Sequence, residues 1–159
     1  MGEAVEKASK PSAKAKALSA RLCAVQAIYQ ILQTGAPVEQ VLQQHLDDAP
    51  TKEIDGEQLV VPDGALLKKI LLGAQERKEE ILEMLDANLK PDKEGGKAKL
   101  DMLLQAILLC GGYELLAHQD IDSPIIINDY LNVTHGFYDK GAVSLVNGML
   151  DALAKSLRA

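Results

Sequence analysis

The chain has 159 residues, of which 47% are apolar, so it can bury a real core as one domain or two small subdomains. Only 3% are aromatic and none is tryptophan, a composition that favours packed helices over a β-sandwich. The net charge of −6 taken alone argues against nucleic-acid binding, and two cysteines without a secretory signal sequence ahead of them predict a reducing, cytoplasmic location.

The start of the chain is basic although the whole chain is acidic. From Lys7 to Arg21 there is no acidic residue, so this end attracts polyanions. We expect residues 1–16 to form a basic flexible tail. Charge alone leaves two interpretations open: contacts to a nucleic acid, or a solvated tail whose lysines only aid solubility.

Helical spacing of apolar residues predicts three helices in the N-terminal half, a bundle over residues 17–92. The first covers about residues 16–33 and ends near Gly35, with Arg21 at the edge of its buried stripe, packed by its stem or aimed outward. The second covers about residues 37–46, with His45 at the edge of the core. An irregular connection over residues 47–62, with an extended piece at 59–61, leads to Asp63, which caps a long helix to about residue 90.

The linker PDKEGGKAK at residues 91–99 separates this half from a C-terminal bundle over residues 97–158. The apolar stretch at 102–117 is too short to cross a bilayer of about 30 Å, so we expect a buried helix and no membrane contact. Its paired glycines allow either a close helix contact or a kink. Ser123 and Asp139 are expected to cap two further helices, and Gly148 inside the last one predicts a close approach by another backbone. The fold class is therefore all-α, with six to seven helices in two small bundles.

No group of residues has the spacing of a catalytic or metal site. Cys23, Cys110 and the three histidines are scattered, and there is no nucleophile elbow, nucleotide loop or HExxH motif. We therefore expect no enzyme activity, no catalytic residues, no metal and no cofactor.

Four short segments follow one another in an informative order. They are Cys23-Ala24-Val25-Gln26-Ala27-Ile28-Tyr29, Tyr113-Glu114-Leu115, Ile127-Asn128-Asp129-Tyr130 with Phe137 after it, and Val146-Asn147-Gly148-Met149-Leu150-Asp151. Together they resemble the blocks of the NusB family of bacterial transcription antitermination factors, over about residues 18–36 and 100–158. The middle of the chain matches only in being helical.

The resemblance implies a NusB-like fold and an RNA-binding antitermination factor. Such proteins pair with the ribosomal protein NusE and bind boxA RNA, and the RNA polymerase antitermination complex then reads through terminators in ribosomal RNA operons. The family's basic N-terminal segment contacts RNA, which makes Lys10, Lys14, Lys16 and Arg21 the candidate RNA-binding residues. Tyr29 is carried over as the candidate contact to the protein partner, with a place at the rim of the core as the alternative.

Four positions depart from the family pattern. Leu145 replaces a phenylalanine that could stack on a base, and Ser144 replaces a basic residue before it. Leu109 stands where an arginine is expected, and Leu104 stands at a usually polar position that helps face the partner. An added apolar patch favours burial against a protein. The alternative function is therefore a NusB-fold module that has lost boxA binding and acts in protein interaction or in dimerisation, as a homodimer.

Overall fold

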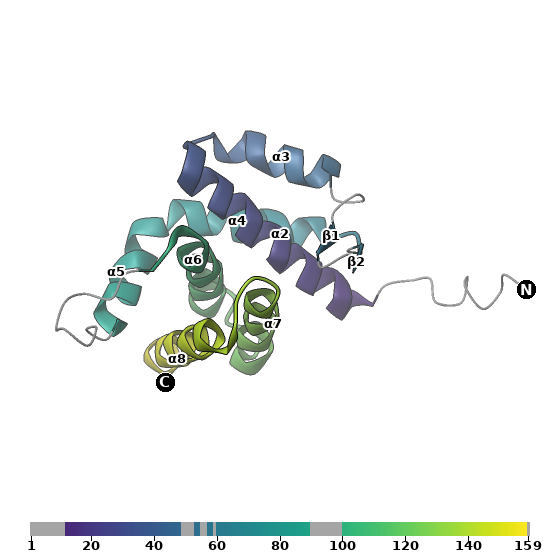
Figure 1. Cartoon of the computed structure of the whole chain (residues 1–159). Helices are drawn as coiled ribbons and strands as arrows, with labels where there is room; N and C mark the ends of the chain where they lie inside the picture. Colours follow the sequence, from purple (N-terminus) through teal and green to yellow (C-terminus); the bar gives the residue numbers. More distant parts are fainter. Residues whose placement is uncertain (1–11, 49–52, 55–56, 59, 90–99, 159) are drawn as a thin grey trace, which may run out of the picture.

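The computed structural model describes residues 12–48, 53–54, 57–58, 60–89 and 100–158 of the chain. Within these ranges the protein is helical apart from one very short hairpin, which confirms the predicted all-α class and the expected number of helices (Figure 1). The helices are α2 (Ala13–Thr34), α3 (Val38–Asp48), α4 (Gly64–Glu76), α5 (Lys78–Asn88), α6 (Met102–Ala117), α7 (Ser123–His135) and α8 (Lys140–Leu157). Strand β1 (Glu53–Ile54) pairs antiparallel with β2 (Glu57–Gln58).

Two helices organise the packing. Helix α2 runs across the molecule and contacts α3, α4, α6 and α7, while α6 contacts α4, α5, α7 and α8 as well (Figure 1). Because α2 packs against both α4 and α6, it connects the helices before and after the linker. The core is aliphatic except for the fully buried ring of Tyr130. The division into a tail at 1–16 and bundles at 17–92 and 97–158 stays a prediction.

Polar caps fix most helix starts, as expected from the sequence. The Asp63 carboxylate accepts a hydrogen bond from the Leu66 N–H at 3.1 Å, and the Asp139 carboxylate accepts one from the Gly141 N–H at 3.2 Å. Each cap satisfies an amide that has no partner inside its own helix. At the other end of α2, Gly35 adopts a left-handed conformation with φ of 72° and closes the helix, which glycine does without steric cost.

Two sequence expectations about helix boundaries are wrong. The long helix predicted to reach residue 90 breaks at Arg77, whose φ of −102° and ψ of 18° lie outside the helical region, and α5 begins there. Ser123 lies inside α7, and Asp122 is the residue before its first turn. The connection after α3 contains the β1–β2 hairpin; of the extended piece expected at 59–61, residue 59 lies outside the described residues.

The glycines of α6 and α8 differ in their surroundings. Helix α6 is continuous through Gly111 and Gly112, and an added Cβ at Gly111 would lie 3.0 Å from the Leu150 side chain, so these glycines serve close helix contact rather than a kink. A Cβ at Gly148 would meet nothing within 4 Å. The close approach expected at Gly148 is therefore not made by any described part of the same chain.

Replacing Gly73 by alanine is expected to destabilise the protein by about 1–3 kcal/mol, because the Tyr113 ring occupies the space that the new methyl group needs. Without that contact the change would instead favour the helix by up to about 1 kcal/mol. Chemical denaturation of Gly73→Ala measures the loss. In a Tyr113→Leu background the same change should be close to neutral or stabilising; an equal loss in both backgrounds would contradict the assigned contact.

Candidate nucleic-acid and partner surfaces

The start of α2 is the best-defined basic feature in the described part of the chain. Lys14 and Lys16 lie on its first turns, both are exposed, and neither forms an ion pair with a described residue. The cap is the neutral Ser12, whose hydroxyl accepts from the Ala15 N–H at 3.0 Å. The positive end of the helix dipole and the two lysine ammonium groups therefore face solvent. No carboxylate in the first turn of α2 compensates their charge.

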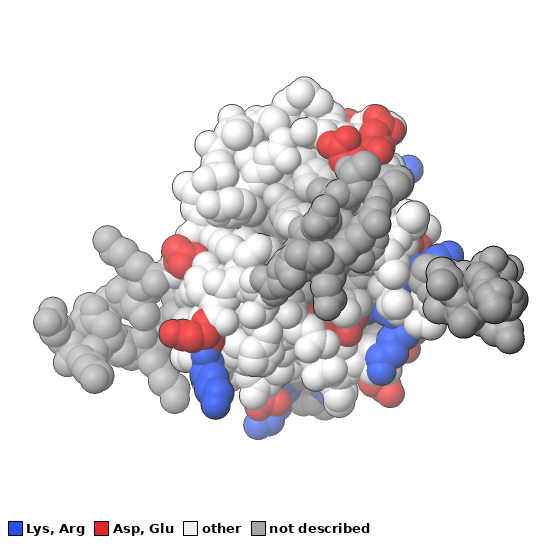
Figure 2. All heavy atoms as spheres, turned by 45° about the vertical axis from the view of Figure 1, so that its right-hand side comes forward, with Lys and Arg blue, Asp and Glu red and all other residues white. Residues whose placement is uncertain are grey.

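This arrangement differs from that of the other described helices. Each of them has an acidic cap or an acidic residue in its first turn: Glu39, Asp63, Glu79 and Glu80, Asp101, Asp122 or Asp139. Lysines at a helix N-terminus cost stability, of the order of 0.3–1 kcal/mol each, unless an anion is present. The start of α2 is thus suited to binding an anion. The face shown in Figure 2 carries scattered charges of both signs, and the described residues on it form no large basic patch.

Two hydrogen bonds hold this helix start against the segment before α4. The Asp63 N–H donates to the Lys16 carbonyl oxygen at 3.1 Å, and the Ser19 hydroxyl donates to the Val60 carbonyl oxygen at 2.6 Å. The lysines therefore project from a fixed backbone. Lys10, the remaining candidate in the tail, lies outside the described residues.

Arg21 is not an RNA-facing residue, and this expectation is corrected by its burial. Its residue surface is only 2% exposed. The guanidinium donates to both Glu114 carboxylate oxygens, at 2.7 and 2.9 Å, and to Asp129 Oδ2 at 2.8 Å. The planar guanidinium has several N–H groups and can bind both carboxylates at once. Its positive charge is therefore neutralised inside the protein. Glu114 and Asp129 each lie within an otherwise apolar face of a helix, which signals a buried partner, but the sequence does not show that the partner is Arg21.

Glu114 is the centre of a buried polar network that joins α2, α6 and α7. Besides Arg21, its carboxylate accepts a hydrogen bond from the Tyr130 hydroxyl at 2.6 Å and lies 3.0 Å from His118 Nδ1. Burial alone would raise the pKa of Glu114, but the hydrogen bonds from His118 and Arg21 and the Arg21 charge lower it below its ordinary value. Burial raises the pKa of Tyr130, assisted by the Glu114 charge. The network holds three helices together, and only its His118 edge reaches the surface.

The described residues contain no set of three or more histidine, cysteine, aspartate or glutamate side chains arranged to hold a metal ion. Both cysteines are buried and neither takes part in a disulfide bond, and burial raises the pKa of the Cys110 thiol. Among the described helices, none combines the length and the apolar character needed to cross a bilayer.

Tyr29 lies half-buried on the surface of α2, where its hydroxyl accepts a hydrogen bond from Gln33 Nε2 at 3.1 Å. Close to it, the Tyr138 hydroxyl donates to Asp101 Oδ1 at 2.7 Å. Burial, the Asp101 hydrogen bond and charge, and the neighbouring Tyr29 raise the pKa of Tyr138. The start of α6 and the corner before α8 thus share a surface with Tyr29. Sequence reasoning missed Asp101 and Tyr138 because they are 37 residues apart.

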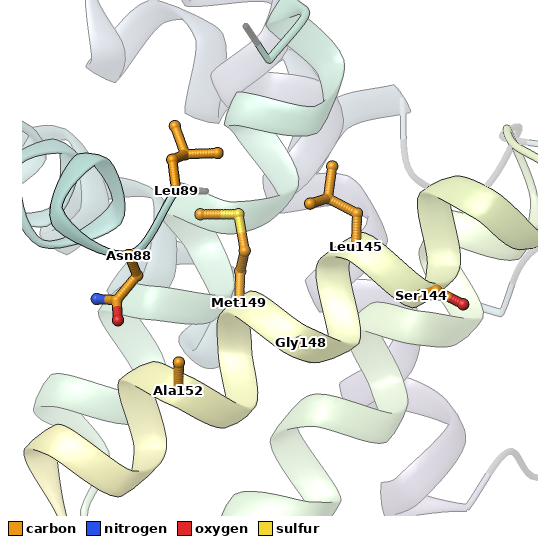
Figure 3. A pocket seen from close by; sticks show the side chains of 7 residues that line it. All are labelled: Asn88, Leu89, Ser144, Leu145, Gly148, Met149 and Ala152. Atoms are coloured by element: carbon orange, nitrogen blue, oxygen red, sulfur yellow. The ribbon is translucent and has the colours of Figure 1, made fainter. Parts of the chain in front are cut away.

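The leucines that depart from the family pattern do not form one exposed patch. Leu104 and Leu109 are buried, whereas Leu145 is 39% exposed. Leu145 lines a groove of about 400 Å³ between the end of α5 and α8, where it faces Leu89 across Met149 (Figure 3). Ser144 and Gly148 of α8 also line this groove.

Taken together, the fold and these surfaces define an all-helical binding protein with a basic helix start. The model of the NusB family matches residues 18–155. The chain therefore belongs to the NusB family, whose members are non-enzymatic transcription antitermination factors.

Relatives from several bacteria carry the same description, transcription antitermination protein NusB. The protein of Novosphingobium aromaticivorans is 35% identical over 147 residues, which cover 92% of this chain and 97% of the relative. That of Allorhizobium ampelinum is 32% identical over 140 residues, covering 88% and 86%. Both comparisons span nearly the whole of each protein, so the similarity is not confined to one motif.

Two solved structures share the fold at lower sequence identity. NusB of T. maritima superimposes with a TM-score of 0.71 at 20% identity, covering 94% of this chain and 95% of that one. A structure of antitermination factors NusB and NusE in complex with dsRNA matches with a TM-score of 0.70 at 21% identity, covering 87% and 96%. These matches confirm the predicted NusB-like fold.

Proposed function

We propose that this chain pairs with NusE and binds boxA RNA as part of the RNA polymerase antitermination complex on ribosomal RNA operons. Such a role places it in the bacterial cytoplasm beside nascent transcripts. Family membership supports the antitermination role, and a solved relative of the same fold is found with NusE and dsRNA. The observation on this chain that carries the RNA part is the start of α2, where Lys14 and Lys16 are exposed without an ion-pair partner among the described residues.

In this proposal Lys10, Lys14 and Lys16 supply phosphate contacts, and Arg21 supports them only by fixing α2 from inside. Lysines give charge attraction without the paired hydrogen bonds of arginine, so they position RNA rather than read its sequence. Recognition of the boxA sequence therefore depends on other groups and on the partner. Tyr29 is the proposed contact to NusE, because it is half-buried and lies near Tyr138, whose hydroxyl binds Asp101, so apolar and polar groups are both present there.

The double variant Lys14→Ala with Lys16→Ala is expected to weaken boxA binding about tenfold or more at low salt. Each lost phosphate contact should also reduce the slope of log affinity against log salt by about 0.7–0.9, so the pair should reduce it by about 1.5. Fluorescence anisotropy of labelled boxA RNA, with and without NusE, at several salt concentrations measures both quantities.

The matched control is Lys68→Ala with Lys69→Ala, which removes the same charge from exposed positions of α4. The control should bind boxA nearly as well as the wild type. Equal losses in the two double variants would mean that only net charge matters. Equally weak binding of boxA and a scrambled RNA, with and without NusE, would reject the proposed function.

A protein-interaction or dimerisation module remains the second candidate function. It is favoured by one specific observation, the exposed Leu145 beside an apolar groove, at the position where the sequence resemblance leads one to expect an aromatic ring.

A further inference from the structure

A second groove, of about 330 Å³, lies between α7 and α8, which pack against each other. Its lining includes Ser123, Ile127, Asn128 and Leu131 of α7 and Asn147 and Asp151 of α8. The side chains of Ile127 and Leu131 are half-buried and pack against the core, whereas the two asparagines and Asp151 are exposed. This α7–α8 groove therefore combines an aliphatic part that belongs to the core with polar groups that face solvent.

The two asparagines of the α7–α8 groove have no partner in the described part of the protein. Asn128, Asn147 and Asp151 lie in two of the segments that carry the family resemblance, residues 127–130 and 146–151. Neither carboxamide forms a hydrogen bond with a described residue, although asparagine is a poorer helix former than alanine. The proposed RNA and NusE contacts do not use these residues either. Their amides are therefore available to another ligand.

The charge of the α7–α8 groove argues against RNA as that ligand. Its lining contains the carboxylate of Asp151 and no basic or aromatic residue, so it offers neither a phosphate contact nor a surface for stacking a base. Asp122, just before the first turn of α7, is also exposed. Asp151 pairs with Lys155 at 3.1 Å, but their side chains are 53% and 77% exposed, so the pair contributes little stability. A lysine or arginine of a ligand can replace Lys155 there at little cost.

The spacing of the polar groups matches an extended peptide. Asn147 and Asp151 are four residues apart on α8, a rise of about 6.0 Å along the helix. In an extended chain the groups on one edge repeat every two residues, or about every 6.6 Å. An asparagine carboxamide both accepts from a peptide N–H and donates to a peptide carbonyl oxygen, so it can hold a main chain of any sequence. An aliphatic side chain of the same peptide can contact Ile127 and Leu131.

Arg158 holds the end of α8 against the start of α7. Its guanidinium donates to Ser123 Oγ at 3.2 Å and to the carbonyl oxygens of Leu115 and Ile121 at 2.9 and 2.6 Å. These bonds tie α8 to α6 and to the turn before α7. The α7–α8 groove is therefore preformed, and a ligand does not have to order it.

We propose that the α7–α8 groove binds an extended segment of a protein partner, with its main chain on Asn128 and Asn147 and a lysine or arginine side chain at Asp151. The amides supply hydrogen bonds that do not depend on the peptide sequence, and Asp151 supplies the preference for a cation. The proposal does not rest on boxA or NusE binding. Because the groove is small and open, a short peptide should bind with a dissociation constant of about 0.1–1 mM.

Nuclear magnetic resonance spectra of the ¹⁵N-labelled full chain test the proposal through the side-chain amide signals of Asn128 and Asn147. The probes are capped heptapeptides of alternating valine and serine with one lysine, moved through successive positions. At least one of them should shift both amide signals saturably. Its analogues with glutamate in place of lysine, or with N-methylated peptide bonds, should bind about tenfold more weakly. If no lysine peptide shifts these signals at millimolar concentration, the proposal is wrong.

Substitutions separate the backbone contacts from the charge. Asn128→Ala and Asn147→Ala should each weaken the peptide about three- to tenfold and remain folded, since alanine favours the helix. Asp151→Asn should abolish the preference for lysine over glutamate. Asn132→Ala is the matched control, because Asn132 is exposed on α7 outside the groove lining, and it should bind like the wild type. Wild-type affinity in both groove variants would contradict the assigned contacts.

Two further outcomes would give the α7–α8 groove to another occupant and overturn the proposal. If boxA RNA shifts the same amide signals and displaces the peptide, the groove belongs to the RNA surface. If these signals move on dilution of the protein alone, a second copy occupies it. The variant with Lys14→Ala and Lys16→Ala should bind the peptide like the wild type, which keeps this test separate from that of RNA binding.

Discussion

Replacing Arg21 by alanine is expected to lower the free energy of unfolding by about 3–5 kcal/mol. Arg21 is buried, and its guanidinium is bound by Glu114 and Asp129 from two other helices. Without Arg21, the carboxylates of Glu114 and Asp129 remain in the interior close to each other. Among the described ion pairs, His118 is the one other basic side chain at this site, and it pairs with Glu114 alone. Because domains of this size are stable by only about 5–15 kcal/mol, urea denaturation at neutral pH should show the loss clearly.

Two further variants separate the missing charge from the missing packing. Arg21→Lys keeps a positive charge but cannot bind both Glu114 oxygens through a planar fork, so it should be destabilised by an intermediate amount. The triple variant with Arg21→Met, Glu114→Gln and Asp129→Asn removes all three charges and should recover much of the stability lost in Arg21→Ala. If Arg21→Ala were as stable as the wild type while RNA binding fell, Arg21 would face RNA, and its assignment to the core would be wrong.

Local chemistry made much of the fold predictable from the sequence. The helix expected at about residues 16–33 is observed as Ala13–Thr34, and it ends at Gly35 as expected. Asp63 and Asp139 cap their helices because an aspartate before an amphipathic stretch satisfies amides that the helix leaves unpaired. These signals lie within a few residues of each other, so one sequence without relatives is enough to detect them.

Features that depend on distant residues were not predictable. The helix breaks at Arg77, which is neither proline nor glycine. The helical spacing of apolar residues continues on both sides of it, so the sequence does not mark the break. Arg21 lies 93 residues from Glu114 and 108 from Asp129, so spacing alone left its side chain free to point either way. Tyr29 was carried over from the resemblance, but its neighbours Tyr138 and Asp101 come together only through the packing of α2, α6 and the corner before α8.

Replacing Glu114 by glutamine is expected to cost about 2–3 kcal/mol of stability at pH 7, and the difference from the wild type should shrink as the pH falls. Burial by itself disfavours the charged carboxylate, but the hydrogen bonds from His118 and Arg21, with the Arg21 charge, hold its folded-state pKa below the ordinary value of 4.5. A carboxyl group with a lowered pKa stabilises the folded state above its unfolded pKa. That contribution is lost as the pH falls through the folded pKa.

Urea denaturation of both proteins between pH 7 and the acid limit of folding tests this. The difference curve, wild type minus Glu114→Gln, isolates Glu114 because other carboxylates contribute similarly to both proteins. It should be flat above about pH 5 and decline below the ordinary pKa of 4.5. Glu83→Gln, which changes an exposed carboxylate on α5, should follow the wild type throughout. If the curves of the wild type and Glu114→Gln run parallel down to acid unfolding, Arg21 does not hold the Glu114 carboxylate in its charged form. The network would then join the three helices through packing and neutral hydrogen bonds alone.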